Sequence, residues 1–348
     1  METTTAPTLP ATVAPSSEHT DAGADESTRY PIEYLHGMSS AEPTGVTIVS
    51  GTSVIDVDTD AMRPIAGLPA FDDQNVWATP SADRAVIGVQ RSGSTNPEIF
   101  VLDRDSRSAR PLGSGFPAPA PDGVWLKRFE SPTSCVASKV AFDGPIIRSA
   151  TPIDCAAAVT GEYGIGLIMA VSDIEPRYAL VSPVDLSTVT KLDGFKSVIG
   201  SRILTLAGHG FGLIDPLTGE GRQVEMPTSI GMPSGLSWPA DGAHVAIAFG
   251  HPAWPGPRQR LDVWVLDVDS LEWTELPSMP VAAALKMTAY QWLADGRFAI
   301  FGEFDRVGPA LATWRPGDAQ LVVHPLTGTT SQGAVMWCTL GELCAKSR

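Results

Sequence analysis

The stretch PSADRAVIGVQ at residues 80–90, followed by EIFVLDRDSRSARPL at 98–112, decides the fold because its pattern returns along the chain. The later copies are WPADGAHVAIAFG with LDVWVLDVDSLEWTELP, at 238–250 and 261–277, and WLADGRFAIFG with LATWRPGDAQLVVHPL, at 292–302 and 311–326. Each copy contains a turn built on Asp, an apolar strand, a loop and a second strand with a polar exit. Gly and Asp tolerate the tight geometry of hairpin turns. The pattern therefore predicts repeated β-hairpins.

The repeat has the length of one propeller blade. The ends of the second strands recur every 33 to 52 residues, at Asp56, Asp103, Ser149, Ser182, Asp215, Asp267 and Arg315. Units of about 40 to 50 residues with several short strands and no helical period are typical of a β-propeller. We predict an all-β chain with one propeller of seven four-stranded blades. Six or eight blades are the alternatives, because the copies around 124–154 and 164–192 are degenerate.

A strand from one end of the chain must close such a ring. The first copy, GVTIVSG and SVIDVD at 45–51 and 53–58, has no inner strand before it, whereas AVMWCTL at 334–340 is a spare strand after the last copy. An open ring leaves a sheet edge unpaired and a blade face unburied. We predict that the C-terminal strand completes the first blade. The segment 30–35 is the competing closure strand.

The chain divides into a tail and a propeller domain. Residues 1–29 are rich in Thr, Pro, Ala, Ser and acids, and this composition predicts a disordered tether ahead of a propeller at 30–348. The tether has no apolar run of signal-peptide length. Tethers of this kind often follow a membrane anchor or a lipidated cysteine in exported bacterial proteins. We therefore expect an extracytoplasmic protein with a membrane tether upstream, and a cytoplasmic protein with a tail is the alternative.

The charge balance bears on the partners. The sequence has 24 Lys and Arg against 39 Asp and Glu, for a net charge of −15. A strongly negative field repels phosphate groups. The composition therefore argues against binding to nucleic acid or to anionic membranes.

Four cysteines form two local pairs in the sequence, Cys135 with Cys155 and Cys338 with Cys344. We predict these two disulfides among the three connectivities that four cysteines allow. The spacing does not suit a structural zinc site. Disulfides would indicate an oxidising compartment, and four buried free thiols are the alternative.

The copies at 80–112 and 238–277 resemble the WD-repeat-like and TolB-like propellers of bacteria, in which a Pro/Asp/Gly turn precedes one strand and an I-x-V-x-D strand follows. Members of this group act as protein scaffolds, ligand sensors or enzymes, so the resemblance implies a fold but no single activity. The chain lacks the Gly-His and Trp-Asp signature of true WD repeats. That difference speaks against a eukaryote-type scaffolding role.

No motif in the sequence assembles a catalytic, metal or cofactor site. The string at 113–115 lacks the five-residue pattern of a nucleophile elbow, and the six histidines are scattered singly. We therefore predict no catalytic residue, no metal ligand and no cofactor. The alternative is a hydrolase, lyase or lactonase in which ligands or carboxylates from different blades converge at the central axis.

Loop length gives the candidate binding surface. The longest loops between second and third strands are predicted at 91–98, 250–260 and 303–309, in blades two, six and seven. Ring closure brings them to one side of one face, and we call this surface the loop sector. Its predicted binding residues are Trp254, Arg258, Arg260, His251, Arg306, Glu303, Arg91 and Asn96. Trp and Arg dominate interface hot spots, and prolines reduce the entropy lost when a loop is held for binding.

These features favour a non-catalytic propeller that binds a protein or an extracellular ligand through the loop sector. The propeller enzyme and a cytosolic interaction scaffold are the alternatives. The alternative for the loop sector is a purely structural role, in which Trp254 caps its own blade and the arginines are solvated.

Overall fold

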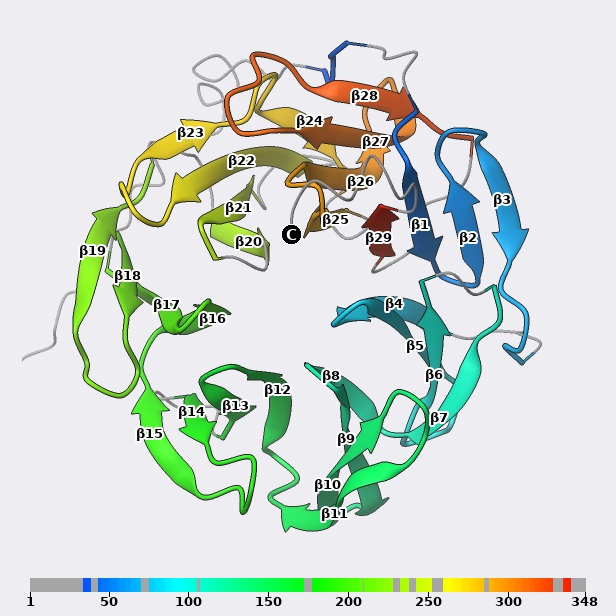
Figure 1. Cartoon of the computed structure of the whole chain (residues 1–348), viewed down its shortest axis with the longest axis vertical. Helices are drawn as coiled ribbons and strands as arrows, with labels where there is room; N and C mark the ends of the chain where they lie inside the picture. Colours follow the sequence, from blue (N-terminus) through cyan, green and yellow to red (C-terminus); the bar gives the residue numbers. More distant parts are fainter. Residues whose placement is uncertain are drawn as a thin grey trace, which may run out of the picture. The chain divides into compact units, whose positions relative to one another are not determined.

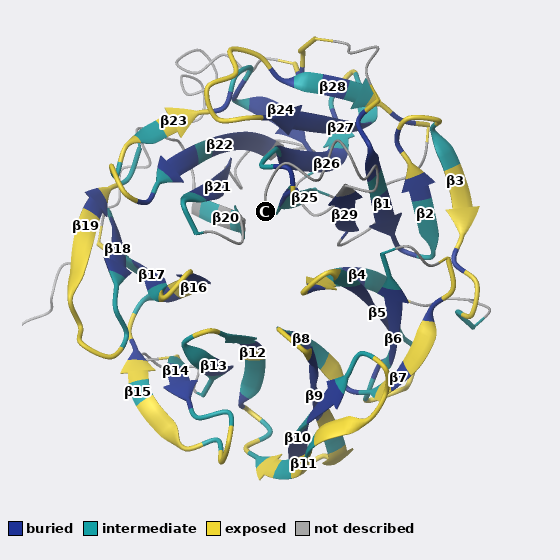
Figure 2. Ribbon diagram, in the orientation of Figure 1, coloured by how far each residue is buried: buried dark blue, intermediate teal, exposed yellow. Residues whose placement is uncertain are grey.

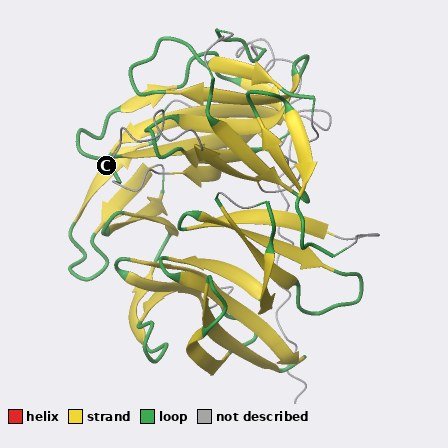
Figure 3. Ribbon diagram, turned by 45° about the vertical axis from the view of Figure 1, so that its right-hand side comes forward, coloured by secondary structure: helices red, strands yellow, loops and turns green. Residues whose placement is uncertain are grey.

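A computed structural model describes the chain within the unit Glu33–Arg348. The described residues are 34–38, 43–69, 75–104, 107–171, 177–208, 210–227, 232–237, 242–251, 259–284, 288–327 and 334–338. Their regular elements are all β-strands (Figure 3), so none of the described residues forms a helix that could cross a membrane. The predicted tether lies outside the described residues, and the domain boundary at residues 29 and 30 stays a prediction.

The strands form seven blades, each an antiparallel meander, arranged in a ring (Figure 1). From the inner to the outer strand, blade one is β29 (Ala334–Cys338), β1 (Val46–Ser50), β2 (Ser53–Asp56) and β3 (Ala61–Pro64); blade two is β4 (Asn75–Ser81), β5 (Arg84–Gln90), β6 (Glu98–Asp103) and β7 (Arg110–Ser114); blade three is β8 (Phe116–Ala120), β9 (Gly123–Ser131), β10 (Ser134–Ala141) and β11 (Ile146–Ile153); blade four is β12 (Ala158–Tyr163), β13 (Gly166–Ala170), β14 (Tyr178–Val181) and β15 (Thr188–Leu192).

The remaining strands complete the ring. Blade five is β16 (Phe195–Ile199), β17 (Arg202–Ala207), β18 (Gly210–Ile214) and β19 (Gly221–Glu225); blade six is β20 (Met232–Ser237), β21 (His244–His251), β22 (Gln259–Asp267) and β23 (Trp273–Glu275); blade seven is β25 (Ala289–Trp292), β26 (Phe298–Phe304), β27 (Gly308–Trp314) and β28 (Val322–Pro325). The predicted all-β propeller with seven blades is confirmed.

Blades six and seven depart from the simple four-stranded pattern. An extra strand, β24 (Val281–Ala283), pairs with β22 on one side and meets β26 at the single pair Ala283 and Phe304 on the other. The two blades therefore share one continuous sheet. The repeat could not predict this strand, because it lies in the link between two copies.

The C-terminal strand closes the ring, as predicted. In Figure 1, β29 lies at the inner side of blade one beside β1, and the two pair antiparallel from Val46 with Cys338 to Ser50 with Ala334. The Gln291 side chain of blade seven donates to the Met336 carbonyl and accepts from its N–H, both at 2.8 Å. The Gln291 amide thus satisfies both backbone groups of Met336, as a neighbouring strand would, and links blade seven to blade one.

The competing closure segment has a different place. Its described end, residues 34–38, lies at the outer strand of blade seven, where Met38 forms a parallel bridge with Val322. Leu35 is buried in the apolar cluster between blades six and seven. The prediction that this segment could close the ring is therefore wrong for its described part, since β29 already occupies the inner edge of blade one.

Seven apolar clusters hold the ring together, one between each pair of neighbouring blades. Alternation along the strands sends apolar side chains to both faces of each inner sheet. The outer strands are the exposed part of most blades, as Figure 2 shows for β3, β7, β15 and β19. The apolar interior therefore lies between the sheets.

A charged network supplements packing between blades three and four. The Lys139 ammonium is 2.8 Å from the Glu162 carboxylate and also pairs with Asp122, although the lysine side chain is only 8% exposed. The Trp125 indole donates to Glu162 at 2.6 Å. Burial alone would lower the pKa of Lys139, but its hydrogen bonds to Asp122 and Glu162 outweigh burial and raise the pKa.

One of the two predicted disulfides lies at this same interface. Cys135 of β10 is bonded to Cys155 in the link from blade three to blade four, 20 residues away in sequence. Lys127 donates to the Cys155 carbonyl at 2.7 Å. Burial lowers the pKa of this lysine, and the negative charge of Asp154 partly offsets that shift. Cys344 and the side chain of Cys338 lie outside the described residues, so the second pair stays a prediction.

Candidate functional site

The strand order locates the three predicted long loops in their blades. The loops from β5 to β6, from β21 to β22 and from β26 to β27 are the second-to-third loops of blades two, six and seven. Successive turns of an antiparallel meander alternate between the two ends of a sheet. These loops therefore share one face, and the turns from β25 to β26 and from β27 to β28 belong to the opposite face, which we call the turn face.

The loop of blade six is only partly described. Trp254 and Arg258 lie outside the described residues, and the side chain of His251 does too, although its backbone belongs to β21. Arg260 is in β22 and is 6% exposed. Because Arg260 is buried, its side chain has no direct access to a partner, and its binding role stays a prediction.

Arg91 and Asn96 occupy the loop of blade two. The Arg91 guanidinium pairs with Glu98 at 3.0 Å, and the two side chains are 47% and 42% exposed. The Asn96 amide donates to the Phe129 carbonyl at 2.8 Å and accepts from its N–H at 2.9 Å. Asn96 therefore fastens this loop to blade three, whereas Arg91 stays accessible.

The loop of blade seven presents a fixed aromatic and cationic pair. The Arg306 guanidinium lies 3.6 Å from the ring centroid of Tyr34, which is 37% exposed. Arg306 has a φ of 62°, a left-handed conformation that non-glycine residues seldom adopt. Glu303 is half-buried on β26, and its carbonyl accepts the N–H of Ala284 at 2.9 Å. The tight turn thus holds Arg306 over Tyr34, a partner that the sequence did not indicate.

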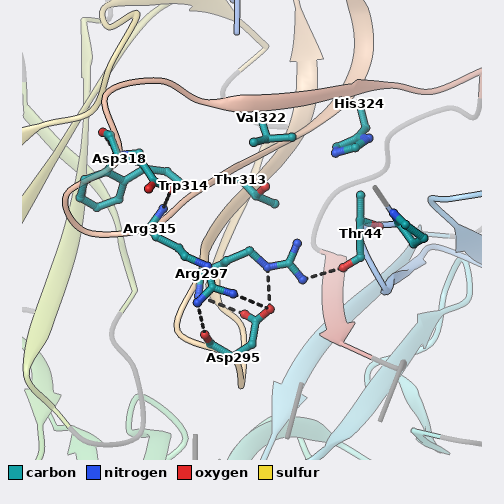
Figure 4. Close-up of a pocket in the computed structure, with 10 residues that line it drawn as sticks. Thr44, Asp295, Arg297, Thr313, Trp314, Arg315, Asp318, Val322 and His324 are labelled. Carbon is teal, nitrogen blue, oxygen red and sulfur yellow. Dashed lines mark hydrogen bonds and ion pairs between the residues drawn. The ribbon is translucent and has the colours of Figure 1, made fainter. Parts of the chain in front are cut away.

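The turn face carries a pocket of about 200 Å³ at the outer part of blade seven, beside blade one. Its lining consists of Pro43, Thr44, Asp295, Arg297, Thr313, Trp314, Arg315, Asp318, Val322 and His324. In Figure 4, Val322 and His324 project from β28, and Arg297 with Asp295 lies across from them. We call this site the turn-face pocket.

A buried carboxylate organises the arginines of this pocket. The Asp295 side chain is 1% exposed; it accepts the backbone N–H of Arg297 at 3.0 Å and its Nε–H at 2.6 Å. Arg315 donates through Nη1 to the Asp295 carbonyl at 3.0 Å, and its Nη2 is 3.5 Å from the carboxylate. Two guanidinium groups around one carboxylate leave one net positive charge.

The opposite wall comes from the chain just before blade one. The Thr44 carbonyl accepts Nη2 of Arg297 at 2.6 Å, and the Thr44 hydroxyl donates to Asp58 at 2.7 Å. Burial lowers the pKa of His324; the Asp58 charge opposes this shift and Arg297 adds to it. His324 is therefore neutral at pH 7, with one ring N–H to donate.

Sequence reasoning did not find this pocket. The copy at 292–302 predicts only a turn built on Asp; Asp295 accepts the Arg297 N–H as such a residue does, and it also binds two guanidinium groups. Arg297, Arg315 and His324 have no motif spacing, because they come from separate turns and strands. The available signal is an arginine beside each of two predicted turns, Arg297 after one and Arg315 before the other.

The axial metal site of the enzymatic alternative has no counterpart within the described residues. No group of three His, Cys, Asp or Glu side chains in that part of the chain is placed to hold a metal ion. The enzymatic alternative with an axial site stays a prediction.

Known propellers share this architecture at low sequence identity. A putative 6-phosphogluconolactonase from Bacteroides fragilis has a TM-score of 0.54 at 10% identity, with 86% of this chain and 99% of that chain covered. The β-propeller domain of the Trilobed protease from Pyrococcus furiosus has a TM-score of 0.50 at 11% identity, with 83% and 97% covered.

TolB from Acinetobacter baumannii is also similar, with a TM-score of 0.41 at 14% identity; the similarity covers 68% of this chain and 64% of that chain, less than two thirds of it. Neither a protein-family model nor a curated protein matches the sequence. The identities are too low to transfer an activity. The chain is an all-β propeller, and its similarity to these solved structures concerns the fold alone.

Proposed function

We propose that this protein is a non-catalytic binding propeller that contacts a protein or another extracellular ligand through the loop sector. The observation that carries the proposal is the stacked pair of Arg306 and Tyr34, 3.6 Å apart at the end of blade seven. Aromatic and arginine side chains supply much of the energy at protein interfaces. A pair already held in place loses little conformational entropy when a partner binds.

The turn-face pocket supports binding rather than catalysis. A general base needs a free lone pair aimed at the proton that it takes. The Asp295 carboxylate instead accepts three hydrogen bonds or ion-pair contacts from Arg297 and Arg315. Its arrangement favours holding a ligand over proton abstraction.

An extracytoplasmic location is part of the proposal. The disulfide between Cys135 and Cys155 supports it, since disulfides persist mainly in oxidising compartments. The composition of residues 1–29 adds the expectation of a leash to a membrane anchor upstream. The location can be tested by alkylating the protein in intact cells of its native host and mapping these two cysteines.

Site-specific photocrosslinking tests the binding surface. A photoreactive amino acid at Ser92, an exposed residue beside Arg91 in the loop sector, should give a discrete adduct with the partner in native-host material. The same amino acid at Leu217, an exposed residue in the turn from β18 to β19, is the control on the turn face. With the partner identified, Arg306→Ala should weaken its binding about tenfold, or ~1.4 kcal/mol, without changing the melting temperature. Equal adducts at the two positions, or unchanged affinity in Arg306→Ala, would reject the loop sector as the binding surface.

A further inference from the structure

We infer that the turn-face pocket binds a carboxylate group, supplied either by a small free carboxylic acid or by the chain terminus of a polypeptide. The pocket lies on the face opposite the loop sector. The inference therefore stands or falls independently of the partner surface proposed above.

The cationic layer of the pocket is built before any ligand arrives. Arg315 is anchored to Asp295 by one hydrogen bond to the backbone carbonyl, at 3.0 Å, and by a contact of 3.5 Å to the carboxylate. Arg297 spans from Asp295 to the Thr44 carbonyl at 2.6 Å. A guanidinium group held in this way can meet a carboxylate with two parallel hydrogen bonds at little entropic cost.

Arg315 is the group that can reach a ligand. Its contacts with described residues use two of the five N–H donors of a guanidinium group, and its side chain is 51% exposed. His324 is on the far wall of the pocket and offers a neutral donor. Val322 and the buried Trp314 add apolar surface for the hydrocarbon part of the ligand.

Size and charge narrow the ligand class. A volume of about 200 Å³ is below the ~300 to 1,000 Å³ of pockets for drug-sized molecules. The Arg297, Asp295 and Arg315 triad has one net positive charge, but Asp318 also lines the pocket and balances it; the Asp318 carboxylate accepts the backbone N–H of Arg315 at 3.1 Å. Asp58, beside the Thr44 wall, adds further negative charge. A short monocarboxylate fits these surroundings better than a dianion such as phosphate.

Titration calorimetry on the full chain tests the inference with three small probes and a peptide pair. Propionate should bind saturably, whereas propionamide, which has the same shape without the charge, and inorganic phosphate should bind at least tenfold more weakly. A short peptide with a free C-terminus is compared with its amidated form. If the peptide with a free C-terminus binds at least tenfold more tightly than propionate, the natural ligand is the chain terminus of a polypeptide. If propionate binds and neither peptide does, the natural ligand is a small free acid.

Variants locate the binding. Arg315→Ala should lower propionate affinity at least tenfold, and Arg315→Lys should retain part of it. Arg222→Ala is the matched control, because Arg222 on β19 also donates to backbone carbonyls, those of Asp269 and Val268, but is outside the pocket. Far-ultraviolet circular dichroism checks that each variant is folded. No saturable binding of either carboxylate probe, equal binding of propionamide or phosphate, or unchanged affinity in both Arg315 variants would overturn the inference.

Discussion

Blades six and seven are joined mainly by large apolar side chains, whereas blades three and four are joined by small ones with charges and a disulfide. The cluster between blades six and seven includes Phe298, Phe304 and Trp314 and is extended by the shared strand β24. In the cluster between blades three and four, five of the nine buried residues are alanine. There the ion pair of Lys139 with Glu162 and the bond from Cys135 to Cys155 are added.

This difference explains why two blades look degenerate in sequence. Apolar packing tolerates the exchange of one hydrophobic side chain for another as long as the pattern is kept. The repeated hydrophobic pattern is therefore clearest in blades that are held together mainly by apolar packing. An ion pair or a disulfide depends on individual partners, so a blade that uses them can lose the pattern and keep its place. Blades three and four, whose repeat is weak, are thus joined by such specific links.

The largest effect is expected at the apolar closure. Trp337 on β29 is buried against blade two, and Trp337→Ala should lower the free energy of unfolding by about 3 to 5 kcal/mol in denaturant titration. Met62 is exposed on β3, the outer strand of blade one, so Met62→Ala should change the free energy of unfolding by less than about 0.5 kcal/mol. A loss below about 1 kcal/mol in Trp337→Ala would show that the ring does not depend on β29.

Removal of the disulfide should lower the free energy of unfolding slightly less than Trp337→Ala does. Replacing Cys135 and Cys155 with Ser frees a loop of about 20 residues in the unfolded chain, which corresponds to about 3 kcal/mol. Chemical denaturation of the oxidised protein and of the double variant measures the difference. Equal stabilities would mean that blades three and four need no covalent link, and the contrast with blades six and seven would weaken.

The smallest of these effects is expected at the buried ion pair. Glu162→Gln keeps an acceptor for the Trp125 indole but removes the charge opposite Lys139, and should cost about 2 kcal/mol because Asp122 still pairs with the lysine. Glu98→Gln, which breaks an exposed pair with Arg91, should cost under about 1 kcal/mol.

The pH dependence of the ion-pair effect has a defined sign. The pKa of Lys139 is raised above its ordinary value of 10.5 in the folded protein, so its contribution is complete below pH 10.5 and is lost as pH rises through the raised pKa. The stability gap between the original protein and Glu162→Gln should therefore stay constant from pH 7 to 10 and narrow at higher pH. A gap that is unchanged at the highest pH would show that the effect does not come from the lysine charge.

Much of the fold could be predicted because its signals are local and repeated. Turns such as that at 294–296, strands of alternating burial and the closing strand Ala334–Cys338 are each contained in a few residues. The closure of blade one by β29 follows from the need to pair every inner edge. The extra strand β24 escaped prediction because it belongs to no copy of the repeat.

The candidate sites differ from the fold in this respect, because their residues come from separate parts of the sequence. The sequence favoured a seven-bladed ring closed by its C-terminal strand, because hydrophobic period and turn chemistry are local properties of neighbouring residues. Only the tertiary structure brought Arg306 onto Tyr34, and Arg297 and Arg315 onto one buried carboxylate. These groups are far apart in the chain or in unrelated turns, and the distances that decide their chemistry exist only after the ring has closed.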